Sequence, residues 1–264
     1  RNSKLSVKET ISFICTLVSG GLNGGIRQHL SNFLITNSNL EMIDISNACR
    51  TRYKIKHTAF EQMFKEVVNF TYQNWNSPKY QFVNRNVIAV DGSKFSLNSS
   101  DELKTSFDKK SMNFENGSHY FPQCMVTTFF DVYRKIPIKR TVQPFASSER
   151  TELIENLDEL PKDAIIVVDR GYWGYEVFYR IIENSTHDFV ARMPSTGSFK
   201  EVDEFSASDK KEDIVTINPT SKFLKKIRAG EIEIETPTPI TLRLIRYTPR
   251  DGTEEIILST TLLD

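Results

Sequence analysis

The 264-residue chain lacks an excess of charge of either sign and any long apolar run. Its 34 Lys and Arg residues balance 34 Asp and Glu residues, so a charged partner has to be met by local patches. The apolar stretch from Ile11 to Leu22 is too short to cross a bilayer. Glu9 interrupts the basic residues before it and no small-x-small cleavage site follows, which argues against a signal peptide. With 39% hydrophobic residues, the chain is expected to bury an ordinary globular core and to associate with no membrane.

Cysteine is scarce. Cys15, Cys49 and Cys124 are odd in number, widely spaced and without a C-x-x-C pair. This pattern fits neither a disulfide framework nor a zinc site. We therefore expect a reducing, cytoplasmic environment.

Several catalytic signatures are also absent. The histidines at positions 29, 57, 119 and 187 form no His-x-x-His or His-Glu-x-x-His pattern, so zinc hydrolase chemistry has no support. Gly-x-Ser-x-Gly and Walker-type glycine loops do not occur, which excludes the common serine hydrolase and nucleotide hydrolase readings.

Two kinds of periodicity divide the chain. Apolar residues recur at helical spacing from Lys4 to about Gln73, which predicts a helical N-terminal domain over residues 1–80. From residue 81 to residue 193 the pattern predicts, in order, a strand, a β-hairpin, a helix, a strand, a helix and a strand. The expected strands are Val87–Val90, Gln123–Phe130, Ile136–Val142, Ala164–Val168 and Asp188–Arg192, and the helices run from Ser147 or Ser148 to Leu160 and from Tyr175 to Glu183.

This order indicates an α/β fold, a ribonuclease H-like mixed sheet with helices on its faces. Residues 194–257 carry short alternating runs, such as Ile227–Ile234 and Ile240–Arg246, and predict a β-rich insertion. Residues 258–264 would then begin the return to the core. The chain opens on Arg1 and ends on an apolar run, so we expect further residues on both sides.

Two apolar strands lead into an aspartate, Val87–Asp91 and Ala164–Asp169. An acid at the carboxyl end of a buried strand meets solvent and can bind a hard cation. Paired carboxylates suit phosphodiester chemistry, because a two-metal site needs oxygen ligands that bridge cations, and Mg²⁺ is the natural ion. The alternative is that each Asp only starts a turn or caps the next helix.

The motifs Val90-Asp91-Gly92-Ser93 and Val168-Asp169-Arg170-Gly171-Tyr172 resemble the first and second acid motifs of insertion sequence 4 family DDE transposases. The resemblance extends to the helical N-terminal region, to Asp131–Pro137 in the hairpin, and to the segment that begins at Leu258, which is similar to the strand before the family's last catalytic helix.

The resemblance implies that Asp91 and Asp169 are catalytic and hold Mg²⁺, for which Mn²⁺ can substitute. It implies hydrolysis and transesterification of double-stranded DNA, at transposon ends and in a target, by a homodimer assembled on DNA. The family's third carboxylate, a Glu on a helix after the insertion, has no counterpart in this sequence, since Glu254 and Glu255 lie in a strand-like context. We therefore expect weak metal binding and inefficient cleavage by this chain alone.

Basic clusters mark candidate DNA contacts. Arg50, Arg52, Lys54 and Lys56 lie within a few residues of one another and suit phosphate contact or, equally, a solvated helix face. Arg170 either contacts a scissile phosphate or pairs with an acid. Further candidates are Arg134 with Lys135, Lys139 with Arg140, and Lys222 with Lys225, Lys226 and Arg228.

Three functional hypotheses follow: a DDE transposase, a DNA-binding transposase remnant without catalysis, and a ribonuclease H-like nuclease of another specificity. Strand joining distinguishes the transposase from the nuclease. A downstream helix with the third acid distinguishes the transposase from the DNA-binding remnant.

Overall fold

The computed structural model describes residues 5–19, 25–36, 43–110, 121–234, 236–250 and 255–263. The chain divides into two compact units, Arg1–Phe70 and Thr71–Asp264. Among the described residues, no helix combines the length and the apolar character needed to span a membrane.

The first unit is helical, as predicted. It contains α1 (Val7–Ser19), α2 (Gly25–Thr36), α3 (Ile45–Arg52) and most of α4 (His57–Asn74). The rings of Phe13 and Phe33 meet edge to face at 5.5 Å and hold α1 against α2. A small core surrounds them, made of Leu5, Leu30, Ile43 and Ala48.

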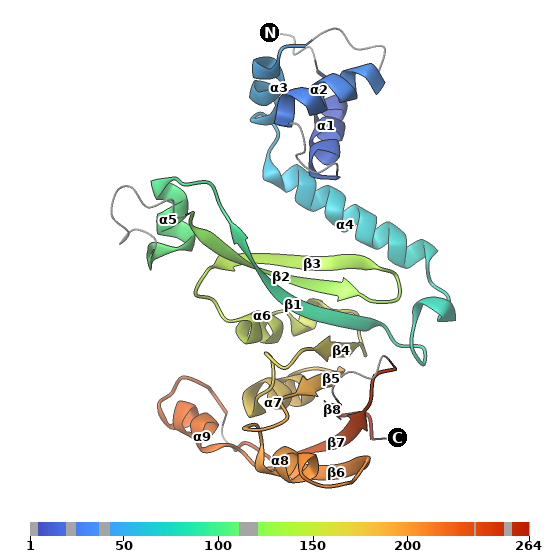
Figure 1. The fold of residues 1–264 in the computed structure, drawn as a ribbon, viewed down its shortest axis with the longest axis vertical. Coiled ribbons are helices and arrows are strands. Elements are labelled where there is room, and N and C mark those ends of the chain that lie inside the picture. Colours follow the sequence, from blue (N-terminus) through green and yellow to red (C-terminus); the bar gives the residue numbers. More distant parts are fainter. Residues whose placement is uncertain are drawn as a thin grey trace. The chain divides into compact units, whose positions relative to one another are not determined.

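The second unit is built on one sheet. Its elements in chain order are η1 (Pro78–Tyr80), β1 (Val87–Ser96), α5 (Asp101–Phe107), β2 (Gln123–Asp131), β3 (Ile136–Pro144), α6 (Glu149–Glu155), η3 (Leu157–Glu159), β4 (Ile165–Val168), α7 (Tyr175–Asn184), β5 (Asp188–Met193), α8 (Lys200–Ser206), β6 (Glu212–Ile217), α9 (Ser221–Arg228), β7 (Ile240–Tyr247) and β8 (Ile256–Thr260). Within the described residues the strands form one eight-stranded sheet in the order β3-β2-β1-β4-β5-β8-β7-β6, which Figure 1 shows from top to bottom.

The sheet mixes parallel and antiparallel pairs in the way the sequence predicts. β1, β2 and β3 form an antiparallel meander, while β1, β4 and β5 run parallel. Parallel neighbours need crossover connections, and α6 and α7 supply them. Ile165, Ile166 and Val168 of β4 are buried, with Ile166 fully inaccessible. The predicted ribonuclease H-like mixed sheet is therefore confirmed.

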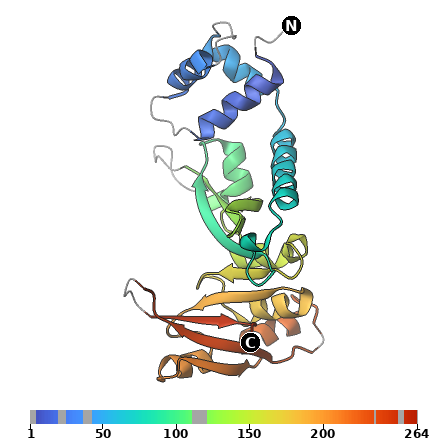
Figure 2. The same cartoon turned by 90° about the vertical axis from the view of Figure 1, so that its right-hand side faces the viewer.

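Residues 194–257, for which we expected a β-rich insertion, contain the helices α8 and α9 as well as strands. The strand predicted over Ile227–Ile234 is wrong, because α9 extends to Arg228 and a turn follows it. α9 places Phe223 in the core and leaves Lys222, Lys225 and Arg228 exposed, a helical pattern that short alternating runs conceal. β6 and β7 continue the core sheet through β8, which pairs with β5. β8, the last strand of the described chain, thus lies in the interior of the sheet, between β5 and β7 (Figure 2).

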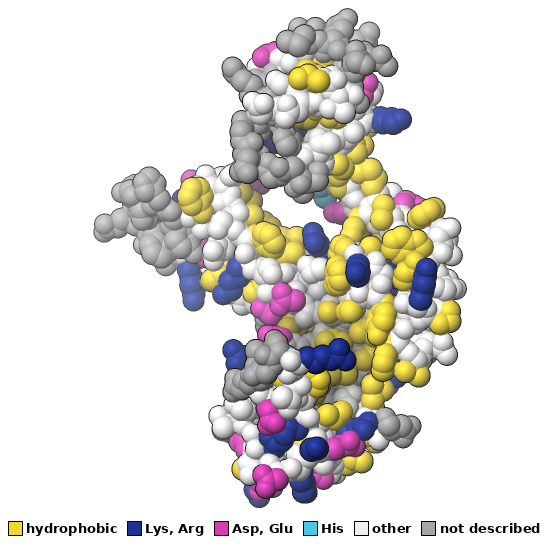
Figure 3. Space-filling model, turned by 45° about the vertical axis from the view of Figure 1, so that its right-hand side comes forward, with side chains coloured by type: hydrophobic (Ala, Val, Ile, Leu, Met, Phe, Trp, Pro, Cys, Tyr) yellow, Lys and Arg dark blue, Asp and Glu magenta, His cyan; other side chains and the backbone are white. Residues whose placement is uncertain are grey.

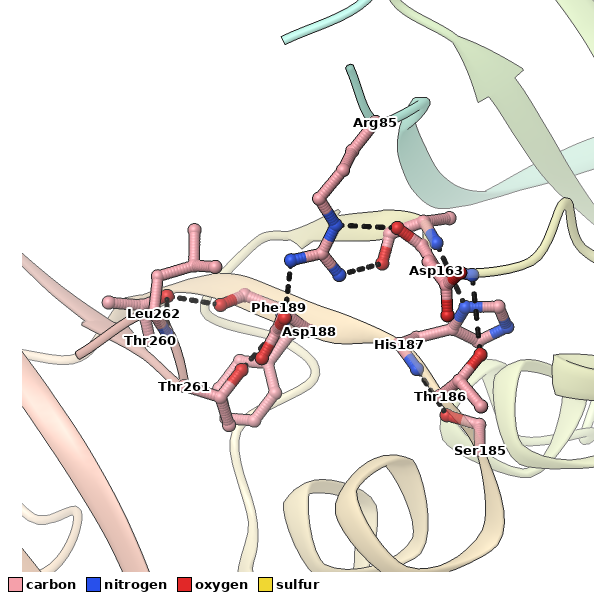
Figure 4. Close-up of polar contacts among 11 residues, drawn as sticks. Arg85, Asp163, Ser185, Thr186, His187, Asp188, Phe189, Thr260, Thr261 and Leu262 are labelled. Atoms are coloured by element: carbon pink, nitrogen blue, oxygen red, sulfur yellow. Dashed lines mark hydrogen bonds and ion pairs between the residues drawn. The ribbon is translucent and has the colours of Figure 1, made fainter. Parts of the chain in front are cut away.

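A polar network ties together the amino-terminal ends of β4 and β5 (Figure 4). Arg85, which precedes β1, donates from Nε to the carbonyl oxygen of Asp163 at 2.6 Å and forms an ion pair with Asp188. His187 is buried and accepts at Nδ1 from the Ala164 amide at 3.2 Å, while Nε2 faces the Leu157 carbonyl at 3.0 Å. A neutral imidazole protonated on Nε2 satisfies both contacts. His187 therefore has a structural role at this end of the sheet.

A second network is buried at the turn between β2 and β3. Asp131 accepts from the Arg134 guanidinium at 2.9 Å and from the Tyr72 hydroxyl at 2.9 Å. Arg134 also donates to the side chain of Asn86 at 2.8 Å, and only 3% of its surface is accessible. The prediction that Arg134 contacts DNA is therefore wrong, because its charge is enclosed and compensated inside the protein.

Candidate active site

The two predicted aspartates follow paired residues of neighbouring parallel strands. Val90 of β1 lies opposite Val168 of β4, so Asp91 and Asp169 come next on adjacent strands at the same edge of the parallel ladder. Both are exposed, although Val90 and Val168 are buried. The sequence placed both acids at strand ends, but only β4 ends there. β1 continues to Ser96 and pairs with β2 beyond Asp91.

A tight turn fixes Asp169. Its Oδ1 accepts from the amide of Gly171 at 2.7 Å, and its carbonyl oxygen accepts from the amide of Tyr172 at 3.2 Å. A Cβ at Gly171 would lie 2.9 Å from Oδ1, so a larger residue there would displace the Asp169 carboxylate. Asp169 therefore starts a turn, as the alternative reading held, and still presents its Oδ2 atom at the sheet edge.

A third carboxylate, Glu149, joins the two aspartates. It is the first residue of α6, which packs on β1. A Cβ at Gly92 would come within 2.4 Å of Glu149 Cγ and Cδ, so the Glu149 side chain crosses directly over the residue after Asp91. Burial raises the pKa of Glu149, and the charges of Asp91 and Asp169 raise it further, while Tyr172 and Lys94 oppose the rise. Glu149 thus lies within electrostatic reach of both aspartates.

Tyr172 lies beside Glu149. Its side chain is fully buried, and within the described residues its hydroxyl has no hydrogen-bond partner of full geometry. Burial, together with Glu149 and the two aspartates, raises the pKa of Tyr172. The hydroxyl therefore stays protonated at neutral pH and remains available as a donor toward Glu149 or a ligand of the acids.

The carboxylates of this site suit a hard cation whose remaining ligands come from water and substrate. Among the described residues, no three His, Cys, Asp or Glu side chains are arranged to enclose a metal ion. Mg²⁺ does not need such an enclosure, since it is usually bound by one or two carboxylates, waters and substrate phosphates. Asp91 and Asp169 would supply the two carboxylates, and Glu149 adds negative charge beside them.

Cations flank the site on the β5 side. Arg170 and Arg192 line a small pocket of about 70 Å³ together with Arg246. Arg246 is engaged, because its guanidinium donates to the carbonyl oxygens of Phe205 and Ser208 at 2.9 and 2.7 Å. Arg170 is exposed and forms no ion pair within the described part of the chain, so the ion-pair alternative for this residue is not realised there.

The predicted basic cluster belongs to the first compact unit. Arg50 and Arg52 end α3, and Lys54 and Lys56 follow in the turn. Arg52 stacks over the ring of Tyr53, which is 79% exposed, at 5.3 Å. Most of the cluster is therefore open to solvent. On the face drawn in Figure 3, Lys and Arg side chains are scattered among hydrophobic ones and form no continuous basic stripe.

The two aromatic residues of the turn Gly171–Gly174 lie in different environments. Tyr172 packs into the core, whereas Trp173 is only half-buried and borders a cavity. Glu149 was missed altogether. The sequence predicts a helix from Ser148, but nothing in it signals that this helix brings a carboxylate over Gly92.

Comparisons with known proteins give no match to a protein-family model and none to a curated protein. Among solved structures, the chain is similar to piggyBac transposase in a synaptic complex with hairpin DNA, with a TM-score of 0.47 and 10% identity over 100% of this chain. The chain spans about half, 55%, of that protein's length. It is also similar to Ciona intestinalis endonuclease V in complex with DNA containing an inosine, with a TM-score of 0.25 and 12% identity, covering 72% of this chain and 82% of that one.

Proposed function

We propose that this chain is the catalytic core of a DDE-type DNA transposase of the insertion sequence kind. It acts on double-stranded DNA at transposon ends and in a target, as a homodimer on DNA, in the cytoplasm. Asp91 and Asp169 hold Mg²⁺ or Mn²⁺. Fold alone does not specify function, so the proposal depends on the site.

The observation that carries the proposal is the position of the two aspartates after the paired residues Val90 and Val168. Two exposed carboxylates that follow paired residues of adjacent strands can ligate the same hard cation. Burial is the main cause of the raised pKa of the neighbouring Glu149, and the charges of Asp91 and Asp169 raise this pKa further.

When bound, Mg²⁺ would polarise a DNA phosphate and offset the charge that develops on it. The chain's own residues would bind the cation and position the DNA phosphate. Asp91 and Asp169 would hold the cation, and Glu149 would add a third negative charge beside it. Tyr172 offers a hydroxyl donor that orients the Glu149 carboxylate, and Arg170 contacts a phosphate of the DNA strand next to the cation.

Metal binding tests the proposal directly. Calorimetric titration of the chain with Mg²⁺ and Mn²⁺ is expected to give weak, saturable binding, and Asp91→Asn and Asp169→Asn are each expected to abolish it. Asp209→Asn is the matched control, because Asp209 is an exposed aspartate on the loop before β6. The Asp209→Asn variant should bind Mg²⁺ and Mn²⁺ with the same affinity as the unmodified chain.

Two results would overturn the proposal. One is binding that survives both Asp91→Asn and Asp169→Asn, since the ion would then lie elsewhere. The other is no binding at millimolar metal even with a short DNA duplex present to supply phosphate ligands.

Activity on DNA separates the transposase from its alternatives. With Mn²⁺ in excess, a transposase is expected to nick a duplex and to transfer the resulting 3′ end to a second DNA molecule. Cleavage of RNA or of random DNA without strand joining would indicate a nuclease of another specificity. DNA binding without any cleavage would indicate a DNA-binding remnant.

A further inference from the structure

A cavity of about 440 Å³ opens beside the acids but does not contain them. It is bounded by the first residues of α6, α7 and α9 and by the segment before α8, all within the second compact unit. Cavities of roughly 300–1,000 Å³ hold small organic ligands. The residues that define its chemistry are Arg150, Trp173, Phe199, Lys222, Phe223 and Lys226.

One side of the cavity is aromatic. Phe199 and Phe223 are 5% and 2% exposed and are fixed in the core, where Phe223 also packs against Tyr175 at 5.0 Å. Trp173 meets Phe199 edge to face, with ring centroids 5.6 Å apart and an interplanar angle of 87°. Because Trp173 itself is only half-buried, it offers a positioned indole to a ligand in the cavity.

The other side is basic. Arg150 is held by its Nε donating to the Gly171 carbonyl oxygen at 2.8 Å, with its guanidinium 6.0 Å from the Trp173 ring. Lys226 forms an ion pair with Glu176 at 2.6 Å, so it neutralises the carboxylate that lines the cavity. Lys222 is exposed and forms no ion pair among the described residues. Three cations thus face one carboxylate, which leaves the cavity suited to an anion.

We propose that this cavity binds a single nucleotide unit, with its base against Trp173 and its phosphate at Lys222 and Arg150. A flat aromatic base matches the indole, and a phosphate matches the two cations that Glu176 does not occupy. The same chemistry is offered by a nucleotide within a single DNA strand and by a free mononucleotide.

The cavity adjoins the acid site through two short segments. Arg150 follows Glu149 on α6, and Trp173 belongs to the turn that leaves Asp169. A strand with one phosphate at the acids therefore has a neighbouring nucleotide within reach of the cavity. This link to DNA rests on the proposed function, whereas binding in the cavity does not, because neither aspartate lines it.

Fluorescence of Trp173 reports on the cavity. The chain has two tryptophans, and Trp75 stacks on Tyr80 away from the cavity lining, so Trp75→Phe leaves Trp173 as the reporter. In this background and without divalent metal, titration with deoxyadenosine monophosphate and with a short single-stranded oligonucleotide is expected to quench the emission saturably. Lys222→Gln is expected to raise the dissociation constant about tenfold.

Lys225→Gln is the matched control, because Lys225 is exposed on the same helix and does not line the cavity. It should leave binding unchanged, and circular dichroism should show both variants folded. Equal affinity for the mononucleotide and the oligonucleotide would assign the site to free nucleotides, and quenching by the oligonucleotide alone would assign it to the DNA strand. Quenching by neither ligand, or equal losses in the two lysine variants, would overturn the proposal.

Asp91→Asn separates this proposal from the proposed function. The variant is expected to lose metal binding while its Trp173 emission is still quenched by the same ligand. Loss of quenching in Asp91→Asn would mean that ligand binding depends on the acids, and the cavity would not be a site of its own.

Discussion

Glu149 lies so close over Gly92 that no side chain fits at position 92 without displacing it. A Cβ there would be 2.4 Å from Glu149 Cγ and Cδ and 2.7 Å from Oε1. The glycine after Asp91 is thus needed for space, and it allows a carboxylate from α6 to reach the edge of the parallel strands.

Gly92→Ala is therefore expected to move Glu149 rather than to unfold the chain. The clashing atoms belong to a flexible side chain, so the free energy of unfolding should change by less than about 1 kcal/mol, whereas Mg²⁺ affinity should fall. Calorimetry with Mg²⁺ and urea unfolding check the two parts. In a double-mutant cycle with Glu149→Ala, adding Gly92→Ala should cost no further affinity. Additive losses would mean that Gly92 acts independently of Glu149.

Glu149→Gln is expected to flatten the pH dependence of stability in metal-free buffer. The pKa of Glu149 is raised from its ordinary value of 4.5, so the folded state binds more protons than the unfolded state. Stability then falls as the pH rises from about 4.5 through the raised pKa. Urea unfolding between about pH 4 and pH 7 should show this fall in the unmodified chain and a smaller one in Glu149→Gln. Glu155→Gln, on the exposed side of the same helix, should behave like the unmodified chain.

The positions of Asp91 and Asp169 on neighbouring strands could be predicted from the sequence, whereas the position of Glu149 could not, for a physical reason. Asp91 and Asp169 each follow a run of β-branched residues, a local pattern that sequence periodicity detects. The position of Glu149 depends on how α6 packs on β1 and on the absence of a side chain at Gly92, and both are tertiary facts.

Asp131→Ala is expected to destabilise the second compact unit by about 3–5 kcal/mol, because it leaves the buried Arg134 guanidinium without its carboxylate. Tyr72→Phe removes one hydrogen bond to the same carboxylate and should cost about 1–3 kcal/mol. Urea unfolding measures both. Tyr133→Phe is the control, since Tyr133 lies in the same turn but is 38% exposed. Its effect should stay within about 0.5 kcal/mol, and an equal effect of the two tyrosine variants would contradict the assignment.

Arg134 also shows where composition misleads. A basic residue in a turn between two strands is usually solvated, and the sequence does not reveal that the carbonyl oxygens of Trp75 and Tyr80 and the Asp131 carboxylate enclose this one. The strands β7 and β8 were likewise predictable only in part. The alternation in Ile240–Arg246 correctly predicted β7, but its partner β8 joins β5, a long-range pairing that no local pattern encodes.

The basic cluster at the end of α3 is expected to contact DNA phosphates without reading sequence. Lys54→Ala with Lys56→Ala should weaken DNA binding and lower the slope of log K against log salt by roughly 0.9 per lost contact, so by up to about 1.8 for the pair. Lys8→Ala with Lys65→Ala removes the same charge from exposed positions of the first unit outside the cluster and should leave the slope nearly unchanged. Fluorescence anisotropy with a labelled duplex over a range of salt concentrations measures both slopes. If the two pairs lower the slope equally, the effect is one of net charge, and the cluster has no particular part in binding DNA.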